Sequence, residues 1–462
     1  MYFLQLHHIR AKENKEVNTE ISKEDLECFD VSFDSSPANV IAMNAVVKNG
    51  ICGSAMNSNA KAANQHAFSI TVDSGDVCNQ KKSGRCWMFA SLNVMRLEVM
   101  KKLNIKNMEL SQAYPLFYDK LERANYFLEN IIDTLDLPLH DRVIDYLLSA
   151  PMGDGGQWDM FRSIVAKYGV VPQDLMPESE SSSNTHDMDE YLTKKLREYA
   201  MTLRDADTEG NDMNALRELK DDMMDTIYRI LCISLGKPPV KFTWETYDKD
   251  NKFIKIADIT PTDFYNKYVG LDLDSLVTVI NAPTKDKPYG RTFTVKYLGN
   301  VRGGKYPVKY LNLPMDELKK LTIAQLRDGQ TVWFGSDCGQ FSDKKGGYFT
   351  LDAMNVQTLL GTDFPMTKEE RLDYGESLMT HAMVITGVDL DDNDKPIRWK
   401  VENSWGKEVG KDGYYVMSDA WFSEYAYQIL LDRKYLSAEQ SAQFDTDPIE
   451  LQPWDPMGSL AL

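Results

Sequence analysis

Basic residues are scarce in this chain of 462 residues. It has 52 lysines and arginines against 70 aspartates and glutamates, which gives a formal net charge of −18. Nucleic-acid binding depends on basic side chains that neutralise phosphates, so this balance makes it an unlikely partner class. A local group of basic residues does occur, although such groups are usually solvated surface. Its members are Lys237, Lys241, Lys296, Arg302, Lys305 and Lys309.

Long apolar runs and paired cysteines are also missing. No apolar run reaches the roughly 18 residues that a membrane-spanning helix needs, so we expect no membrane segment. The N-terminal stretch 1–10 becomes charged too early for a secretion signal. The six cysteines show no Cys-x-x-Cys spacing; they occupy positions 28, 52, 78, 86, 232 and 338. Free thiols in a reducing compartment are therefore expected, and with them a cytoplasmic protein.

Motifs for nucleotide or metal binding are incomplete. The segment 299–305 has P-loop spacing, but Tyr306 stands where a Ser or Thr would hold Mg²⁺. The segment 389–394 begins like an EF-hand loop, yet it lacks the glycine of the sixth position and the glutamate of the twelfth. The histidines other than His381 show no metal-ligand spacing. We therefore expect neither a metal ion nor a cofactor.

The chain does carry one cysteine in a reactive setting. Cys86 opens an apolar, helix-like run that extends to Leu103, and Gln80 lies shortly before it. A thiol at a helix N-terminus feels the positive end of the helix dipole, which favours the nucleophilic thiolate. The amide of Gln80 can donate to an oxygen beside the sulfur, as an oxyanion hole requires. Because an isolated cysteine is usually a small buried apolar residue, this interpretation needs partners elsewhere.

Two partners lie near the C-terminus. His381 belongs to the run 378–388, which is typical of a buried strand, and Asn403 lies where the next strand ends. Neighbouring strands can hold the two side by side, so that Asn403 fixes the tautomer and the free nitrogen faces Cys86. Trp405 is placed to cover the hydrogen bond between them. The pattern predicts a Cys–His–Asn site.

The order of these residues resembles papain-like cysteine peptidases. Gly84, Cys86 and Trp87 match the local signature Cys-Gly-Ser/Ala-Cys-Trp, whereas Ser83 replaces its disulfide-forming cysteine and Arg85 a small residue. The string Ser-Gly-Arg-Cys-Trp is instead similar to the intracellular branch, the bleomycin hydrolase and aminopeptidase C family. The resemblance extends from about Leu26 to the last residue; the segments that carry it are 155–160, 297–301, 332–335, 375–383 and 453–458.

The resemblance implies an α+β, papain-like fold of two lobes, one helical and one β-barrel-like, with a large helical insertion and a β-rich hook projection. His381 follows Cys86 at roughly twice the separation of papain-type enzymes, so a sizeable insertion is expected. The expected segments are 1–25, a polar extension that is disordered or an extended start; 26–75, an N-terminal wrap with a strand at 40–43; 76–237, the helical lobe with Cys86; 238–312, the hook for assembly; 313–444, the β-rich lobe with His381 and Asn403; and 445–462, a C-terminal arm in the active-site cleft.

The resemblance also implies the activity. It implies a cytosolic cysteine aminopeptidase that removes N-terminal residues from peptides through a thioester on Cys86. Trp87 and Trp405 would lie beside the substrate, and the terminal Leu462 would limit how far a substrate extends and pair with its free amino group. A homohexamer whose sites face an internal cavity is implied as well. An acyltransferase using the same Cys–His pair, a nucleic-acid-binding module and a non-catalytic scaffold are the alternative classes.

Overall fold

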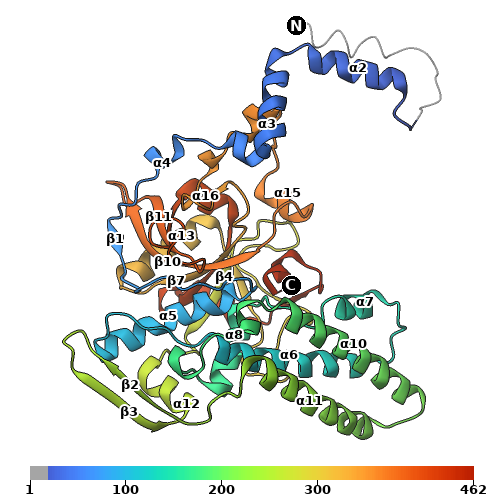
Figure 1. Ribbon diagram of the computed structural model, residues 1–462, viewed down its shortest axis with the longest axis vertical. Helices are drawn as coiled ribbons and strands as arrows, with labels where there is room; N and C mark the ends of the chain where they lie inside the picture. The colour runs from blue at the N-terminus through green and yellow to red at the C-terminus, as the bar shows by residue number, and fades with distance from the viewer. Residues whose placement is uncertain (1–18, 462) are drawn as a thin grey trace. The chain divides into compact units, whose positions relative to one another are not determined.

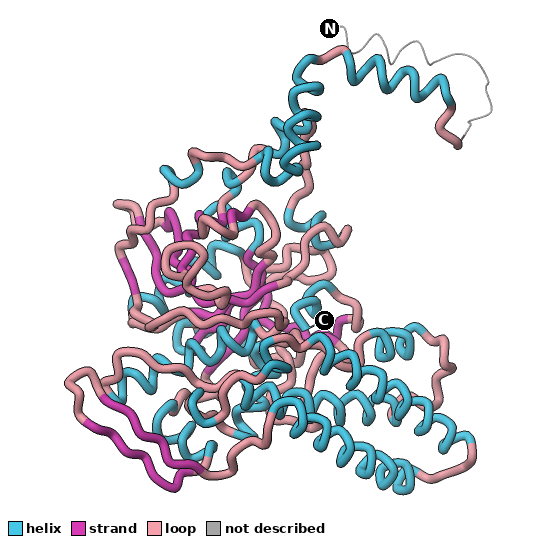
Figure 2. The backbone as a smooth tube through the Cα atoms, viewed as in Figure 1, coloured by secondary structure: helices cyan, strands magenta, loops and turns pink. Residues whose placement is uncertain are grey.

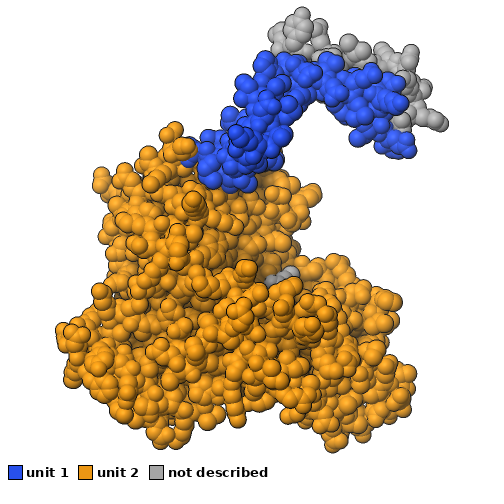
Figure 3. Space-filling model, viewed as in Figure 1, with its two compact units in different colours: residues 1–57, 354–364 blue, residues 58–353, 365–462 orange. Residues whose placement is uncertain are grey.

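The computed structural model describes residues 19–461, and they form two compact units (Figure 3). Unit 1 contains the described residues up to Asn57 together with Met354–Phe364, and unit 2 contains Ser58–Ala353 and the chain from Pro365 onward. Leu462 and residues 1–18 lie outside the described residues. All the other predicted site residues belong to unit 2.

Unit 1 is helical. Helix α2 (Lys23–Asp34) starts with a capping box made by Ser22 and Asp25, and α3 (Pro37–Ala55) starts with a proline, whose fixed φ suits the first turn of a helix. Helix α14 (Val356–Leu360) packs against α3. The prediction of a strand at 40–43 is wrong, because these residues belong to the helix that begins at Pro37.

The helical part of unit 2 surrounds one central helix, α5 (Cys86–Leu103). Nearly every side of α5 is apolar and buried, which is typical of a helix enclosed by other elements. It packs against the large sheet through β10 and β7, and against α8 (Trp158–Tyr168). Three longer helices lie side by side in Figure 1: α6 (Ala113–Ile132), α10 (His186–Thr208) and α11 (Met213–Leu235). The shorter ones are α4 (Ala60–Ala63), α7 (Arg142–Ser149), α9 (Glu180–Ser183), α12 (Pro261–Phe264), α13 (Met315–Arg327), α15 (Lys368–Asp373), α16 (Asp419–Tyr425) and α17 (Ala438–Phe444).

Twelve of the strands of unit 2 form one sheet; strands are drawn in magenta in Figure 2. At its centre, β10 (His381–Leu390) runs antiparallel to β7 (Val332–Ser336) on one side and to β11 (Pro396–Glu402) on the other. His381 begins β10 and Asn403 directly follows β11, so antiparallel pairing brings both to the same end of the sheet. The remaining strands are β1 (Ile70–Thr71), β4 (Leu276–Ile280), β5 (Thr292–Val295), β6 (Tyr310–Asn312), β8 (Ser342–Asp343), β9 (Tyr348–Phe349), β12 (Tyr414–Ser418), β13 (Ala426–Asp432) and β14 (Ile449–Leu451).

The segment 238–312 differs from the single projection expected of it. Strands β2 (Phe242–Tyr247) and β3 (Phe253–Ile259) do form a separate two-stranded sheet. In contrast, β4, β5 and β6 belong to the large sheet, where β4 pairs with β13 and all five of its residues are buried. A strand that is buried at every position needs cover on both faces, which a projecting hairpin does not provide. The role of this segment in assembly stays a prediction.

No helix between residues 19 and 461 has both the length and the apolar character that spanning a membrane requires.

Candidate active site

Cys86 occupies the first position of α5, and its side chain is only 4% exposed. The residue before it, Arg85, provides no side-chain cap for the helix. Instead its buried guanidinium makes two hydrogen bonds to the carboxylate of Glu178 and a third to the backbone oxygen of Ser182. This paired fork fixes the entry of the chain into α5. Sequence reasoning noted Arg85 only as a departure from the papain signature and missed this contact.

His381 and Asn403 meet at the end of the sheet. The Nε2 atom of His381 lies 2.8 Å from Oδ1 of Asn403. The indole of Trp405 stacks on the imidazole, with ring centroids 4.9 Å apart. The backbone N–H of Ala382, the residue after His381, donates to Sγ of Cys86 at 3.4 Å. The bond to Asn403 therefore holds Nε2 and leaves Nδ1 for proton transfer.

Burial is the largest influence on the pKa values of Cys86 and His381. Burial raises the pKa of the Cys86 thiol to about 11, although the Ala382 N–H opposes the shift. Burial likewise lowers the pKa of His381 to about 4, against the bond to Asn403, which raises it. Burial therefore favours the neutral form of each group taken by itself and opposes the effect of the helix dipole that the sequence suggested. A proton moving from sulfur to imidazole creates two opposite charges that stabilise each other.

Gln80 is tied to the segment that carries Asn403. Its backbone N–H donates to the Ser404 carbonyl at 2.8 Å, and its Oε1 accepts from the Ser404 hydroxyl at 2.5 Å. Its Nε2 donates to the carbonyl of Ser83 at 2.6 Å. An amide nitrogen has two protons, so one remains for an oxygen of a bound substrate. The first backbone N–H groups of α5 have no acceptor within the helix and supply a second source of donors.

Trp87, predicted to lie beside the substrate, packs beneath the loop at Gly155 and Gly156. Its side chain is fully buried, and its Nε1 donates to the Asp154 carbonyl at 2.7 Å. A Cβ added to Gly156 would lie 2.5 Å from the indole ring, so the backbone of this loop rests directly on the tryptophan. Trp87 therefore shapes the site through the loop at Gly155 and Gly156.

The C-terminal arm reaches this loop. Its last described turn, η5 (Pro456–Ala461), is mostly buried. A Cβ added to Gly155 would lie 2.3 Å from the carbonyl oxygen of Leu460, and the hydroxyl of Ser459 donates at 2.9 Å to the carbonyl of Met379, two residues before His381. The arm thus bridges the loop at Gly155 and the strand of the histidine. Leu462, predicted to act at its end, lies outside the described residues.

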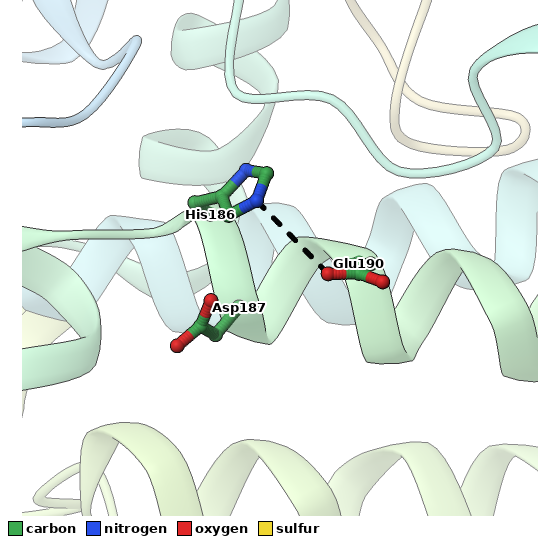
Figure 4. Close-up of side chains that lie close together, drawn as sticks. All are labelled: His186, Asp187 and Glu190. Atoms are coloured by element: carbon green, nitrogen blue, oxygen red, sulfur yellow. Dashed lines mark ion pairs between the residues drawn. The ribbon is translucent and has the colours of Figure 1, made fainter.

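One set of potential metal ligands occurs within residues 19–461. His186, Asp187 and Glu190 have ligand atoms within 4.8 Å of one another, and Figure 4 shows the imidazole of His186 reaching toward Glu190. All three are exposed at the start of α10. Acidic side chains are stabilised there by the positive end of the helix dipole, so their presence needs no bound ion. We assign no metal to this group.

Known proteins are similar to this chain over most of its length. The model of the Peptidase C1-like family matches residues 20–458. Aminopeptidase C of Listeria monocytogenes is 48% identical over 446 residues, 96% of this chain and 100% of the relative. Bleomycin hydrolase of Mus musculus is 40% identical over 453 residues, 96% and 99% of the two chains. The crystal structure of pepw from Lactobacillus rhamnosis HN001 matches with a TM-score of 0.94 and 48% identity, covering 96% of this chain and 99% of its own.

The chain belongs to the Peptidase C1-like family of cysteine peptidases. The resemblance found in its sequence and the papain-like fold are therefore confirmed. Within that family it is a cysteine-type aminopeptidase.

Proposed function

We propose that the protein removes single residues from the N-termini of peptides, with Cys86 as nucleophile, His381 as base and acid, and Asn403 as the residue that orients the histidine. The sulfur attacks the first peptide carbonyl as its proton passes to the imidazole. The imidazolium then protonates the leaving amine, and the neutral ring activates the water that hydrolyses the thioester. No metal or cofactor takes part in these steps. Two contacts support the proposal most directly: the bond between the side chains of His381 and Asn403, and the bond from the backbone N–H of Ala382, the residue after His381, to the sulfur of Cys86.

The oxyanion has two candidate donors, the second amide N–H of Gln80 and the backbone N–H of Cys86. Each such donor is commonly worth about 2.7–4 kcal/mol of transition-state stabilisation. Gln80 is placed for this role because Ser404 holds its amide oxygen. Its backbone bond to the same residue keeps it in register with Asn403.

A substrate panel tests the proposal. Fluorogenic aminoacyl amides with a free amino group should be hydrolysed, and the same amides blocked at the amino group should not. Prior treatment with iodoacetamide should stop the reaction, because it consumes the nucleophilic thiol. Cleavage of blocked and free substrates at equal rates, or activity that survives alkylation, would contradict the proposal.

We also propose a cytoplasmic homohexamer. All six cysteines are free, which suits a reducing compartment. Unit 1 supports self-assembly. Helix α2 has no buried residue, and α2 and α3 both expose many large apolar side chains. Those most exposed are Phe29 and Val31 on α2 and Ile41 and Val47 on α3. Apolar surface of this extent is typical of an interface.

Light scattering should give a mass six times that of the chain. Replacing Val31 and Val47 by lysine should reduce the mass to that of smaller species, because each lysine would have to be buried without a partner in an apolar interface. Asn44→Lys adds the same charge at an exposed polar position of α3 and serves as the control. A monomeric wild type, or an assembly that both lysines leave intact, would exclude assembly through this surface.

A further inference from the structure

Asp154 ties down the backbone on both sides of the nucleophile. Its Oδ2 accepts a hydrogen bond from the backbone N–H of Gly84 at 2.8 Å, and its carbonyl accepts from the indole of Trp87 at 2.7 Å. Gly84 comes two residues before Cys86 and Trp87 comes directly after it. A single residue from a distant loop therefore holds the chain as it enters and begins α5.

The approach of Asp154 is close enough to require glycine. A Cβ added to Gly84 would lie 2.7 Å from the Cβ of Asp154, closer than real side chains come. On the other side of Asp154 the chain continues as Gly155, on which Leu460 of the C-terminal arm rests. Asp154 is therefore connected both to the nucleophile and to the surface that carries the arm.

A buried lysine holds Asp154 in place. The Nζ atom of Lys120, on a fully buried side chain, lies 2.8 Å from Oδ1 of Asp154, 2.9 Å from the carbonyl of Gly153 and 2.7 Å from Oδ1 of Asp189. The hydroxyl of Thr185 also donates to Asp154 Oδ2. A buried ammonium is costly unless paired, so this set of bonds fixes the carboxylate in one position.

We propose that Asp154, held by Lys120, is a positioning residue that sets the approach of Cys86 to its substrate and supports the loop beneath the C-terminal arm. The proposal rests on the peptidase function proposed above, in which Cys86 is the nucleophile. The two residues, Lys120 on α6 and Asp154 in the loop before α8, would act on the nucleophile without contacting His381 or Asn403.

The two charges act on the thiol in opposite senses. Although burial acts in the other direction, Lys120 and the hydrogen bonds around it hold the pKa of Asp154 well below its usual range, so the carboxylate is ionised. Its negative charge opposes formation of the Cys86 thiolate. The Lys120 ammonium lies 2.8 Å from the same carboxylate, and a positive charge there acts in the opposite sense. Burial raises the pKa of the nearby Asp189 to about 7. The other charged or titratable groups around the pair are Asp119, Arg123, Lys81, Lys82, His186 and Glu190.

The test measures the rate of Cys86 alkylation by iodoacetamide against pH, together with kcat and KM for an aminoacyl amide. In Asp154→Asn an amide oxygen can still accept from Gly84, but the negative charge is gone. The alkylation midpoint, which is the pH at which the alkylation rate is half its maximum, should therefore move to lower pH. In Lys120→Met the carboxylate loses its counter-charge, so the midpoint should move to higher pH. A purely structural role gives no such opposite shifts.

Turnover provides the second measure. Asp154→Ala removes the acceptor for Gly84, so kcat should fall by about tenfold or more, as expected for one lost charge-assisted hydrogen bond, with a smaller change in KM. Glu190→Gln is the matched control, because it removes an exposed carboxylate that lines the same pocket but pairs with Lys194 rather than with Lys120 or Asp154, and its kcat should stay within about twofold of wild type.

Two results would overturn the proposal: an Asp154→Ala enzyme with wild-type kcat, or midpoints that shift in the same direction in Asp154→Asn and Lys120→Met. If Lys120→Met does not fold, the isosteric Asp154→Asn and the Asp154→Ala variant decide the question alone. Alkylation needs no turnover, so these results stay separate from a failure of the wild-type enzyme on the substrate panel.

Discussion

The Cys86→Ala variant should lose all measurable hydrolysis of aminoacyl amides and keep its fold. Without the sulfur no thioester forms, and loss of a nucleophile that acts together with its base lowers kcat by about a millionfold in a comparable hydrolase. The effect on stability should be small, on the order of 1 kcal/mol, because a buried small side chain is replaced by a slightly smaller one. Steady-state rates and a thermal melt measure the two effects separately.

The chain offers a matched control for this variant. Cys232 lies on α11, away from the predicted site, and is partly buried. Cys232→Ala should keep wild-type kcat and remain sensitive to iodoacetamide. Residual turnover in Cys86→Ala, or loss of iodoacetamide sensitivity in Cys232→Ala, would mean that Cys86 is not the nucleophile.

Local patterns in the sequence were enough to predict the elements that carry the site. The helix expected from Cys86 to Leu103 has those bounds in the structure, because its apolar run and its breaks are both local features. The strand of His381 was likewise visible as a long apolar run that ends at a turn. The pairing of Cys86 with His381 and Asn403 was predicted from the three residue types taken together and gained support from the family motif, since nothing local in His381 or Asn403 indicates which cysteine it serves.

Features that depend on long-range pairing could not be found in this way. Strand β4 joins the large sheet through β13, far along the chain, so its apolar run alone could not show which sheet it enters. The buried ion pair of Arg96 and Glu402, with 2.6 Å between its charged atoms, links the helix of Cys86 to the residue before Asn403 across 306 positions. Each of its members in isolation resembles an ordinary surface charge.

Asp154 illustrates the same limit at the site itself. Its bond to Gly84 spans 70 positions, and the string Gly-Asp-Gly-Gly resembles a flexible turn. The signal that was available was indirect: two consecutive glycines and a tryptophan in a segment that resembles the family. Those residues showed only that the segment resembles the family, and the bond that ties the Asp154 carboxylate to Gly84 became apparent only from the folded chain.

Shortening the C-terminal arm should turn the aminopeptidase into an endopeptidase. Deletion of residues 459–462 removes Leu460 and Ala461 from the surface of Gly155, where we expect their backbone to stand in the way of a longer substrate. Peptides and amides blocked at the amino group should change from resistant to cleaved, within about tenfold of the rate for free substrates, because the barrier removed is steric and the catalytic groups stay in place. Rates on paired blocked and free amides measure the change.

Two further variants separate the effect of the arm's position from the effect of its amino-acid sequence. Ser459→Ala removes the bond to Met379 but leaves the length unchanged, so it should retain most of the preference for a free amino group. Gly155→Ala keeps every residue of the arm, but its Cβ would lie 2.3 Å from the Leu460 carbonyl, so the arm must move and blocked substrates should gain access. If the deletion leaves the requirement for a free amino group unchanged, the arm does not set it. The preference for a free amino group must then come from the residues that line the site, because removing the arm would have failed to admit longer or blocked substrates.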